Sequence, residues 1–247
     1  MSAYKSIIVK QLIKGLTFLP LCSIIKGRRY RGEIMTTLLL VRHGYSLSNE
    51  SGTFTGQTDV PLTEEGVRQA ELTARYLAGN YQVDRILSGD LIRTVQTAKP
   101  LSELTKLPIL KEKGLREIYG GKWEGKRAEE ISSLYPADYE RWKNDVGNSC
   151  PTGGESVKEV QVRAVKEIER IVFENEGKTV AVFTHACFIR AAECYYEGLP
   201  LSGMKNIPWV KNASVTELFF AGGKFSMGKI GYAEQLNSLV TSISKGF

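Results

Sequence analysis

The chain contains only two histidines, and each stands directly after a short apolar run. Leu38–Val41 leads into Arg42 and His43, and Thr179–Thr184 leads into His185. Such runs, rich in Val and Leu, are typical of strands buried on both faces. Because ligands bind beyond the carboxyl ends of the strands in an open α/β sheet, both imidazoles are predicted to lie where chemistry takes place.

The pair of Arg42 and His43 could carry out phosphoryl transfer. A neutral imidazole is a nucleophile, and the arginine fork fits phosphate oxygens and stays charged at any usable pH. Phosphoryl transfer needs mainly positioning and charge stabilisation, and the second imidazole, His185, could donate to the transferring oxygens. The tripeptide Arg42-His43-Gly44 alone is a weak signal, because a single histidine is more often a packed or surface residue, so the surrounding sequence decides.

A metal site is the alternative use of two histidines and a carboxylate. The chain has neither an HxH nor an HExxH spacing, and its four cysteines lack zinc-finger spacing. These cysteines are Cys22, Cys150, Cys187 and Cys194. We therefore predict no metal, and free thiols in a reducing cytoplasm. The pattern Asn212-Ala213-Ser214 matches a glycosylation acceptor, which matters only in a secreted chain.

The elements that position these residues alternate between strands and helices. Strands are expected at 37–41, 84–87, 108–110 and 179–184, helices at 63–80, 93–104, 127–145 (broken at Pro136), 155–175 and 187–196, and a hairpin at 214–220 and 224–230. This alternation predicts an α/β domain, a three-layer sandwich with a mostly parallel sheet and helices on both faces. The polar chain after Gly231 is expected to be loose.

The net charge of +6 belongs to an N-terminal extension, residues 1–34, which holds seven Lys and Arg against one Glu. Residues 35–247 balance 26 bases against 26 acids, which argues against a nucleic-acid-binding face. The longest uncharged stretch, 15–25, is too short to span a bilayer, and no cleavage site follows it. We expect a disordered or non-native tail before a natural start at Met35; a membrane-surface segment or an export signal is the alternative.

The sequence resembles the histidine phosphatase superfamily, which includes the cofactor-dependent phosphoglycerate mutases and many small-molecule phosphatases. The resemblance runs from about 36 to 230 and leaves residues 1–34 outside. Its five motifs occur in the family's order and lie at 42–63, 87–98, 115–125, 153–156 and 184–185.

The resemblance implies a role for each matching residue. His43 matches the nucleophile that becomes phosphohistidine, and Arg42, Arg93 and His185 match the rest of the phosphate pocket. The family's sheet is parallel but for one antiparallel edge strand, and its chemistry needs no metal or other cofactor. Arg93 has a simpler alternative as a solvated charge on its helix.

Glu117 matches the general acid, which protonates the leaving oxygen and then activates water. Glu112 and Glu124 are its rivals in the same stretch, and the loop Leu115-Arg116-Glu117 favours Glu117. Trp123 is expected to pack the loop rather than to contact substrate.

The remaining substrate-binding matches are Asn49, Thr55, Gly56 and Ala186. Asn49 would bond the phosphoryl group, although it could simply shape a turn. Thr55 and Gly56 would form the loop over the substrate. Ala186 stands where the family usually has Gly but keeps the backbone N–H needed for anion binding. Tyr45 replaces the usual Glu or Gln and could alter the rim of the pocket.

We therefore predict a cytoplasmic phosphomonoesterase that hydrolyses a small phosphorylated metabolite through phosphohistidine. It would have no integral membrane span and could form a homodimer. A phosphoglycerate mutase is the nearest alternative, but only 67 residues lie between Glu117 and His185, with no Arg-Arg pair among them. An alternative of another class is a catalytically silent protein that binds phosphorylated ligands. The sequence does not identify the substrate.

Overall fold

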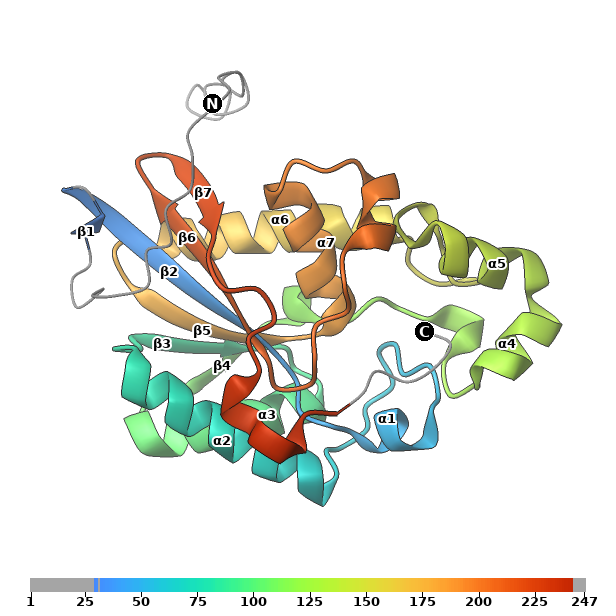
Figure 1. Ribbon diagram of the computed structural model, residues 1–247, viewed down its shortest axis with the longest axis horizontal. Coiled ribbons are helices and arrows are strands. Elements are labelled where there is room, and N and C mark those ends of the chain that lie inside the picture. The colour runs from blue at the N-terminus through green and yellow to red at the C-terminus, as the bar shows by residue number, and fades with distance from the viewer. Residues whose placement is uncertain (1–28, 31, 242–247) are drawn as a thin grey trace.

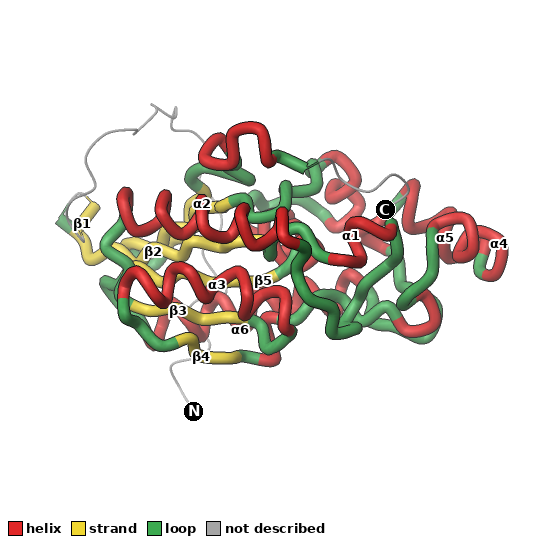
Figure 2. Tube along the Cα trace, turned by 90° about the horizontal axis from the view of Figure 1, so that it is seen from below, coloured by secondary structure: helices red, strands yellow, loops and turns green. Residues whose placement is uncertain are grey.

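A computed structural model describes residues 29–30 and 32–241 of the chain. Most of the predicted N-terminal extension lies outside these ranges. In the described part, helices cover both faces of a central sheet, as Figures 1 and 2 show from two directions. The sheet order is β4 (Ile109–Lys111), β3 (Arg85–Ser88), β5 (Thr179–Thr184), β2 (Glu33–Arg42), β6 (Val215–Ala221) and β7 (Lys224–Met227).

The predicted three-layer α/β sandwich with a mostly parallel sheet is confirmed. Strands β4, β3, β5 and β2 run parallel, while β6 pairs antiparallel with β2 and β7 pairs antiparallel with β6. The antiparallel edge is therefore the predicted hairpin as a whole. Its second strand is shorter than expected, since β7 ends at Met227.

The register between β2 and β5 brings the two histidines together. Arg42 lies opposite Thr184 in the parallel pair, so the next residues, His43 and His185, leave the same sheet edge side by side. The backbone N–H of His43 donates to the Thr184 carbonyl at 3.0 Å and extends the ladder by one bond.

Alternate side chains of β2 enter the two cores, as the period of a strand requires. Leu39 and Val41 pack against α2 (Glu64–Asn80) and α3 (Ile92–Thr105). Leu38 and Leu40 pack with α6 (Val157–Glu174) and α7 (Ala186–Tyr196) on the opposite face. Strand β2 is thus buried on both faces, which explains its continuous apolar run.

The predicted helix starts and breaks are largely observed. The Thr63 side chain accepts the Gly66 N–H and caps α2. The break at Pro136 separates α4 (Ala128–Leu134) from α5 (Pro136–Asn144). These two helices lie beyond the sheet's carboxyl edge, on the right of Figure 1, with α1 (Leu47–Ser51).

The sequence did not indicate α1, whose five residues are too few for a periodic pattern. Shorter 3₁₀ helices occupy Lys113–Leu115, Gly121–Trp123, Val146–Asn148, Leu201–Asn206 and Glu234–Leu239. Trp123 is fully buried, with its ring 5.5 Å from Phe54, so the expectation of loop packing is met.

Two expected element boundaries need correction. The strand expected at 37–41 begins at Glu33 as β2 and pairs with β1 (Arg29–Tyr30), so the sheet extends upstream of Met35. The chain after Gly231 is not loose up to residue 241, because Leu236 is fully buried in its last turn. No helix in the described ranges has both the length and the apolar character needed to cross a membrane.

Candidate active site

A cavity of about 100 Å³ opens where β2 and β5 end. Its lining includes eight residues predicted from the sequence: Arg42, His43, Asn49, Thr55, Gly56, Arg93, Glu117 and Ala186. The ninth, His185, is fully buried against His43, with ring centroids 5.2 Å apart and planes at 60°. The structure thus brings all the predicted site residues together.

His43 is held as a neutral ring with one nitrogen available. Its Nδ1 lies 2.8 Å from the Gly44 carbonyl oxygen, which can only accept, so Nδ1 carries the proton. Burial, followed by the positive charges of Arg93 and Arg42, holds the pKa of His43 well below its ordinary value. The ring is therefore uncharged at neutral pH, with an unprotonated Nε2.

Two buried guanidinium groups accompany His43. Arg42 donates to the Val210 carbonyl at 2.6 Å, and Arg93 donates to the carbonyls of Thr58 and Gly56 at 2.8 and 2.7 Å. Burial lowers the pKa of each arginine to about 10, which leaves both charged at neutral pH. The placement of Arg93 in the cavity excludes its alternative as a solvated charge.

Four buried nitrogen atoms at this site have no hydrogen-bond partner among the described residues. They are Nε of Arg42, Nε of Arg93, and Nδ1 and Nε2 of His185. Buried polar atoms in native proteins nearly always have a partner, and such exceptions point to a ligand. Two cationic donors and an imidazole suit the oxygens of a phosphoryl group.

Burial lowers the pKa of His185 well below its ordinary value, with Arg93 and His43 adding to the effect. The ring is therefore neutral at pH 7, and one of its nitrogens can donate a hydrogen bond. His185 precedes α7, whose first residue, Ala186, lines the cavity.

Glu117 supplies the carboxyl group of the cavity. Its Oε1 accepts the Ile118 N–H at 2.9 Å, and its Oε2 accepts the Cys187 N–H at 3.3 Å. Burial raises the pKa of Glu117 against the opposing effect of these bonds and of Arg93. A raised pKa favours the protonated form that a general acid requires.

The rival carboxylates have other partners. Glu124 accepts from the backbone N–H groups of Gln57 at 2.7 Å and Gly120 at 3.0 Å. Glu112 pairs with Arg170 at 3.4 Å. Since neither lines the cavity, Glu117 is the carboxylate that can reach a ligand there.

Asn49 both shapes a turn and lines the cavity. Its Oδ1 accepts from the backbone N–H and the hydroxyl of Ser46, at 3.1 and 3.0 Å, and so caps α1. A third donor is Nδ2 of Asn212, at 3.1 Å. The same Nδ2 lies 3.1 Å from the His43 carbonyl and 3.3 Å from that of Gly44. Asn212 therefore links Asn49 to the backbone of His43.

The sequence analysis missed the rest of the cavity lining. The remaining lining residues are Thr53, Phe54, Ile118, Trp142, Cys187 and Trp209. The indoles of Trp142 and Trp209 stack at 6.2 Å and 29°, and the Arg190 guanidinium lies 4.3 Å from the centre of the Trp209 ring. These side chains come from separate loops, from α5 and from α7, so no spacing in the sequence groups them.

Tyr45 does not line the cavity, so the expected effect on its rim is not observed. Burial and the nearby Glu50 and Glu65 raise the pKa of its phenol, which places the ring beside α1 and the start of α2. Within residues 29–30 and 32–241, no group of three or more His, Cys, Asp or Glu side chains is arranged to hold a metal ion.

A neutral histidine, two arginines and a carboxyl group lie together at the carboxyl edge of an α/β sheet, an arrangement suited to phosphoryl transfer. Consistently, the model of the histidine phosphatase superfamily (branch 1) matches residues 38–232, and the chain belongs to this family of enzymes. The expected phosphatase character is confirmed, because several of its relatives are named phosphatases.

Three of these similar proteins have the following names and coverage. Phosphoserine phosphatase 1 of Hydrogenobacter thermophilus is 36% identical over 168 residues, which cover 68% of this chain and 79% of that protein. The glucosyl-3-phosphoglycerate phosphatase of Mycolicibacterium vanbaalenii is 29% identical and covers 76% and 89%, respectively. The structure of Bacillus stearothermophilus YhfR superposes with a TM-score of 0.78 and 30% identity, over 82% of this chain and 100% of that one.

Proposed function

We propose that this phosphatase is a metal-independent phosphomonoesterase that transfers the phosphoryl group of a small metabolite first to His43 and then to water. The observation that carries the proposal is the Nδ1–Gly44 hydrogen bond, which leaves Nε2 of a neutral His43 as the nucleophile. Arg42 and Arg93 supply the positive charge that phosphoryl transfer needs.

In the first step, Nε2 of His43 bonds to phosphorus while the phosphorus–oxygen bond of the ester breaks. Arg42, Arg93 and His185 bind the transferring oxygens, with Asn49 beside them. Protonated Glu117 gives its proton to the leaving oxygen, so the alcohol departs neutral. The products are the free alcohol, a phosphohistidine and the Glu117 carboxylate.

In the second step, the carboxylate takes a proton from water as the water oxygen bonds to phosphorus. The phosphorus–nitrogen bond breaks and its electron pair returns to Nε2. Inorganic phosphate leaves, and His43 and protonated Glu117 are restored for the next cycle. Each step needs the same carboxyl group in the opposite protonation state, which its raised pKa supports.

The cavity lining favours hydrolysis over a mutase reaction. Among the described residues that line it, the cationic side chains are Arg42 and Arg93, and both are assigned to phosphate. Phe54, Trp142 and Trp209 face the remaining space, where a phosphoglycerate carboxylate would need a further cation. The complete nucleophile, acid and arginine set disfavours a silent binding protein.

Cytoplasmic location and a homodimer remain predictions of the sequence. The free thiols of Cys150, Cys187 and Cys194 support a reducing compartment.

The test is phosphate release from a panel of phosphomonoesters with a chelator present. Phosphoserine and glucosyl-3-phosphoglycerate belong in the panel because two relatives are named for them. We expect turnover without added metal, and an acid-labile, base-stable phosphoryl adduct on His43 after rapid quench. Activity that disappears with the chelator, or turnover without the adduct, would refute the proposal.

A further inference from the structure

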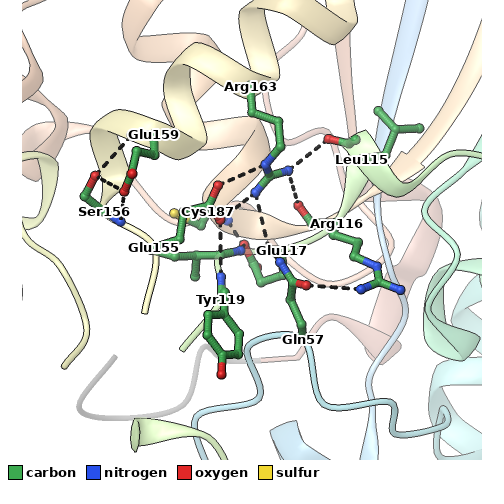
Figure 3. Close-up of polar contacts among 12 residues, drawn as sticks. Gln57, Leu115, Arg116, Glu117, Tyr119, Glu155, Ser156, Glu159, Arg163 and Cys187 are labelled. Atoms are coloured by element: carbon green, nitrogen blue, oxygen red, sulfur yellow. Dashed lines mark hydrogen bonds and ion pairs between the residues drawn. The ribbon is translucent and has the colours of Figure 1, made fainter. Parts of the chain in front are cut away.

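The guanidinium of Arg163, on α6, holds the loop that carries Glu117 (Figure 3). Its Nη1 donates to the carbonyls of Gly114 at 2.9 Å and Arg116 at 2.7 Å, and its Nη2 lies 3.4 Å from the carbonyl of Glu117 itself. The Arg163 side chain therefore holds three of the four backbone carbonyls in residues 114–117, and the last of these residues is the proposed acid, Glu117.

Glu155 completes this arrangement from the residues just before α6. Its two carboxylate oxygens accept from Nε and Nη2 of Arg163 at 3.0 and 2.8 Å, as a bidentate pair. Oε2 also accepts the Tyr119 N–H at 3.3 Å, and the Glu155 N–H donates to the Tyr119 carbonyl at 2.9 Å. The pair thus holds the chain on both sides of Glu117.

This pair differs from an ordinary surface salt bridge, which contributes little. The side chains of Arg163 and Glu155 are only 22% and 18% exposed, and the arginine uses its remaining donors on backbone carbonyls. The loop between residues 114 and 119 has one turn of 3₁₀ helix at its start and no longer element to stiffen it. Its position therefore depends on contacts of this kind.

We propose that Arg163, together with Glu155, is a positioning residue for general acid catalysis. A general acid must lie within hydrogen-bond reach of the leaving oxygen, and a displacement of about 1 Å can cost about a hundredfold in rate. The inference rests on the proposed role of Glu117. It assigns the placement of that acid to α6, whose Arg163 does not line the cavity.

The test is the dependence of the rate on the leaving group. Arg163→Met is compared with the unmodified protein on p-nitrophenyl, phenyl and alkyl phosphates. A nitrophenolate leaves without a proton, whereas an alkoxide needs one. We expect the variant to lose at least about tenfold more kcat/KM on the alkyl ester than on the nitrophenyl ester, because kcat/KM reports the step in which the leaving group departs. Inhibition by inorganic phosphate should be unchanged, since the phosphate pocket is intact.

Arg170→Met is the matched control. Arg170 lies two turns further along α6, is 33% exposed, and pairs with Glu112, Glu167 and Glu174 instead of the acid loop. Its removal should leave the leaving-group dependence unchanged. Arg163→Lys should recover only part of the alkyl-ester rate, because an ammonium keeps the charge but cannot reproduce the planar fork.

Glu117→Gln separates failure of this inference from failure of the proposed acid. If Glu117→Gln steepens the leaving-group dependence while Arg163→Met slows all esters equally, the positioning role is refuted and the acid stands. If Glu117→Gln itself slows all esters equally, the acid assignment is wrong and the inference falls with it. If Arg163→Met fails to fold, as judged by circular dichroism, Glu155→Gln takes its place. The same difference in rate between the alkyl and nitrophenyl esters then decides the inference.

Discussion

Asn212 joins three parts of the site through one amide group, and its replacement tests how the nucleophile is held. Its Nδ2 contacts the carbonyls of His43 and Gly44 and the Oδ1 of Asn49, at 3.1, 3.3 and 3.1 Å. The side chain is 2% exposed, so water does not replace these bonds when they are lost. We expect Asn212→Ala to lower both stability and kcat.

The magnitude follows from the partners that remain. The His43 carbonyl keeps the Ala213 N–H, the Gly44 carbonyl keeps Nδ1 of His43, and Asn49 keeps both donors of Ser46. None of these three acceptors is left bare. The amide NH2 has two hydrogens to share among its three contacts, so the loss is the net worth of about two neutral hydrogen bonds, about 1 to 3 kcal/mol in the free energy of unfolding. Urea unfolding followed by tryptophan fluorescence measures it.

Asn212→Asp sharpens the test. The introduced carboxylate faces acceptor oxygens in a buried site, so its pKa in the folded protein is raised above the unfolded value. Stability is then greatest below the unfolded pKa and falls as pH rises through the folded pKa. At pH 7 this variant should be less stable than Asn212→Ala, and the order should reverse in acid. A loss below about 0.5 kcal/mol in Asn212→Ala, or no pH dependence in Asn212→Asp, refutes the reasoning.

Three further outcomes are expected. His43→Ala should fold, by circular dichroism, yet form no phosphoryl adduct in rapid quench; wild-type-like turnover would contradict the mechanism. The acidic fall in kcat/KM should lie well below the ordinary histidine pKa, because burial and Arg93 keep His43 neutral. With an alkyl ester, kcat/KM should fall again as pH rises through the raised pKa of Glu117, because the acid loses its proton. A nitrophenyl ester, which needs no proton, should show no fall at high pH. A chain that starts at Met35 should keep full activity, because the described elements that it loses are β1 and the exposed first two residues of β2, at the sheet end remote from His43; aggregation or inactivity would show that this end belongs to the functional fold.

The sheet and the phosphate-binding residues could be predicted because they depend on local patterns. The doubly buried strand before His43 gives a continuous apolar run, and Thr63 gives a recognisable helix start. The motifs around Arg93 and Glu117 identified residues that the structure places in one cavity. Parallel strands bring such residues together at the same edge whatever their separation along the chain.

The aromatic part of the cavity lining and the supporting contacts depend on tertiary packing and could not be predicted in this way. Trp142 and Trp209 are 67 positions apart in the sequence and meet through the packing of α5 against the chain that carries Trp209. Asn212 is the first residue of a glycosylation pattern, and nothing local reveals that its amide is buried against the nucleophile. The turn around Leu236 likewise depends on an apolar site supplied by distant elements.

The two arginines of the cavity also tether segments that are far apart in the sequence. Arg93 holds the loop at Gly56 and Thr58, and Arg42 holds the chain at Val210. Loss of either one would remove charge and loosen a loop at the same time, so a reduced rate in an uncharged variant measures two effects together. Lysine supplies the charge without the fork, so the difference between the lysine and methionine variants isolates the effect of charge. The difference between the native arginine and the lysine variant measures the part that belongs to loop order.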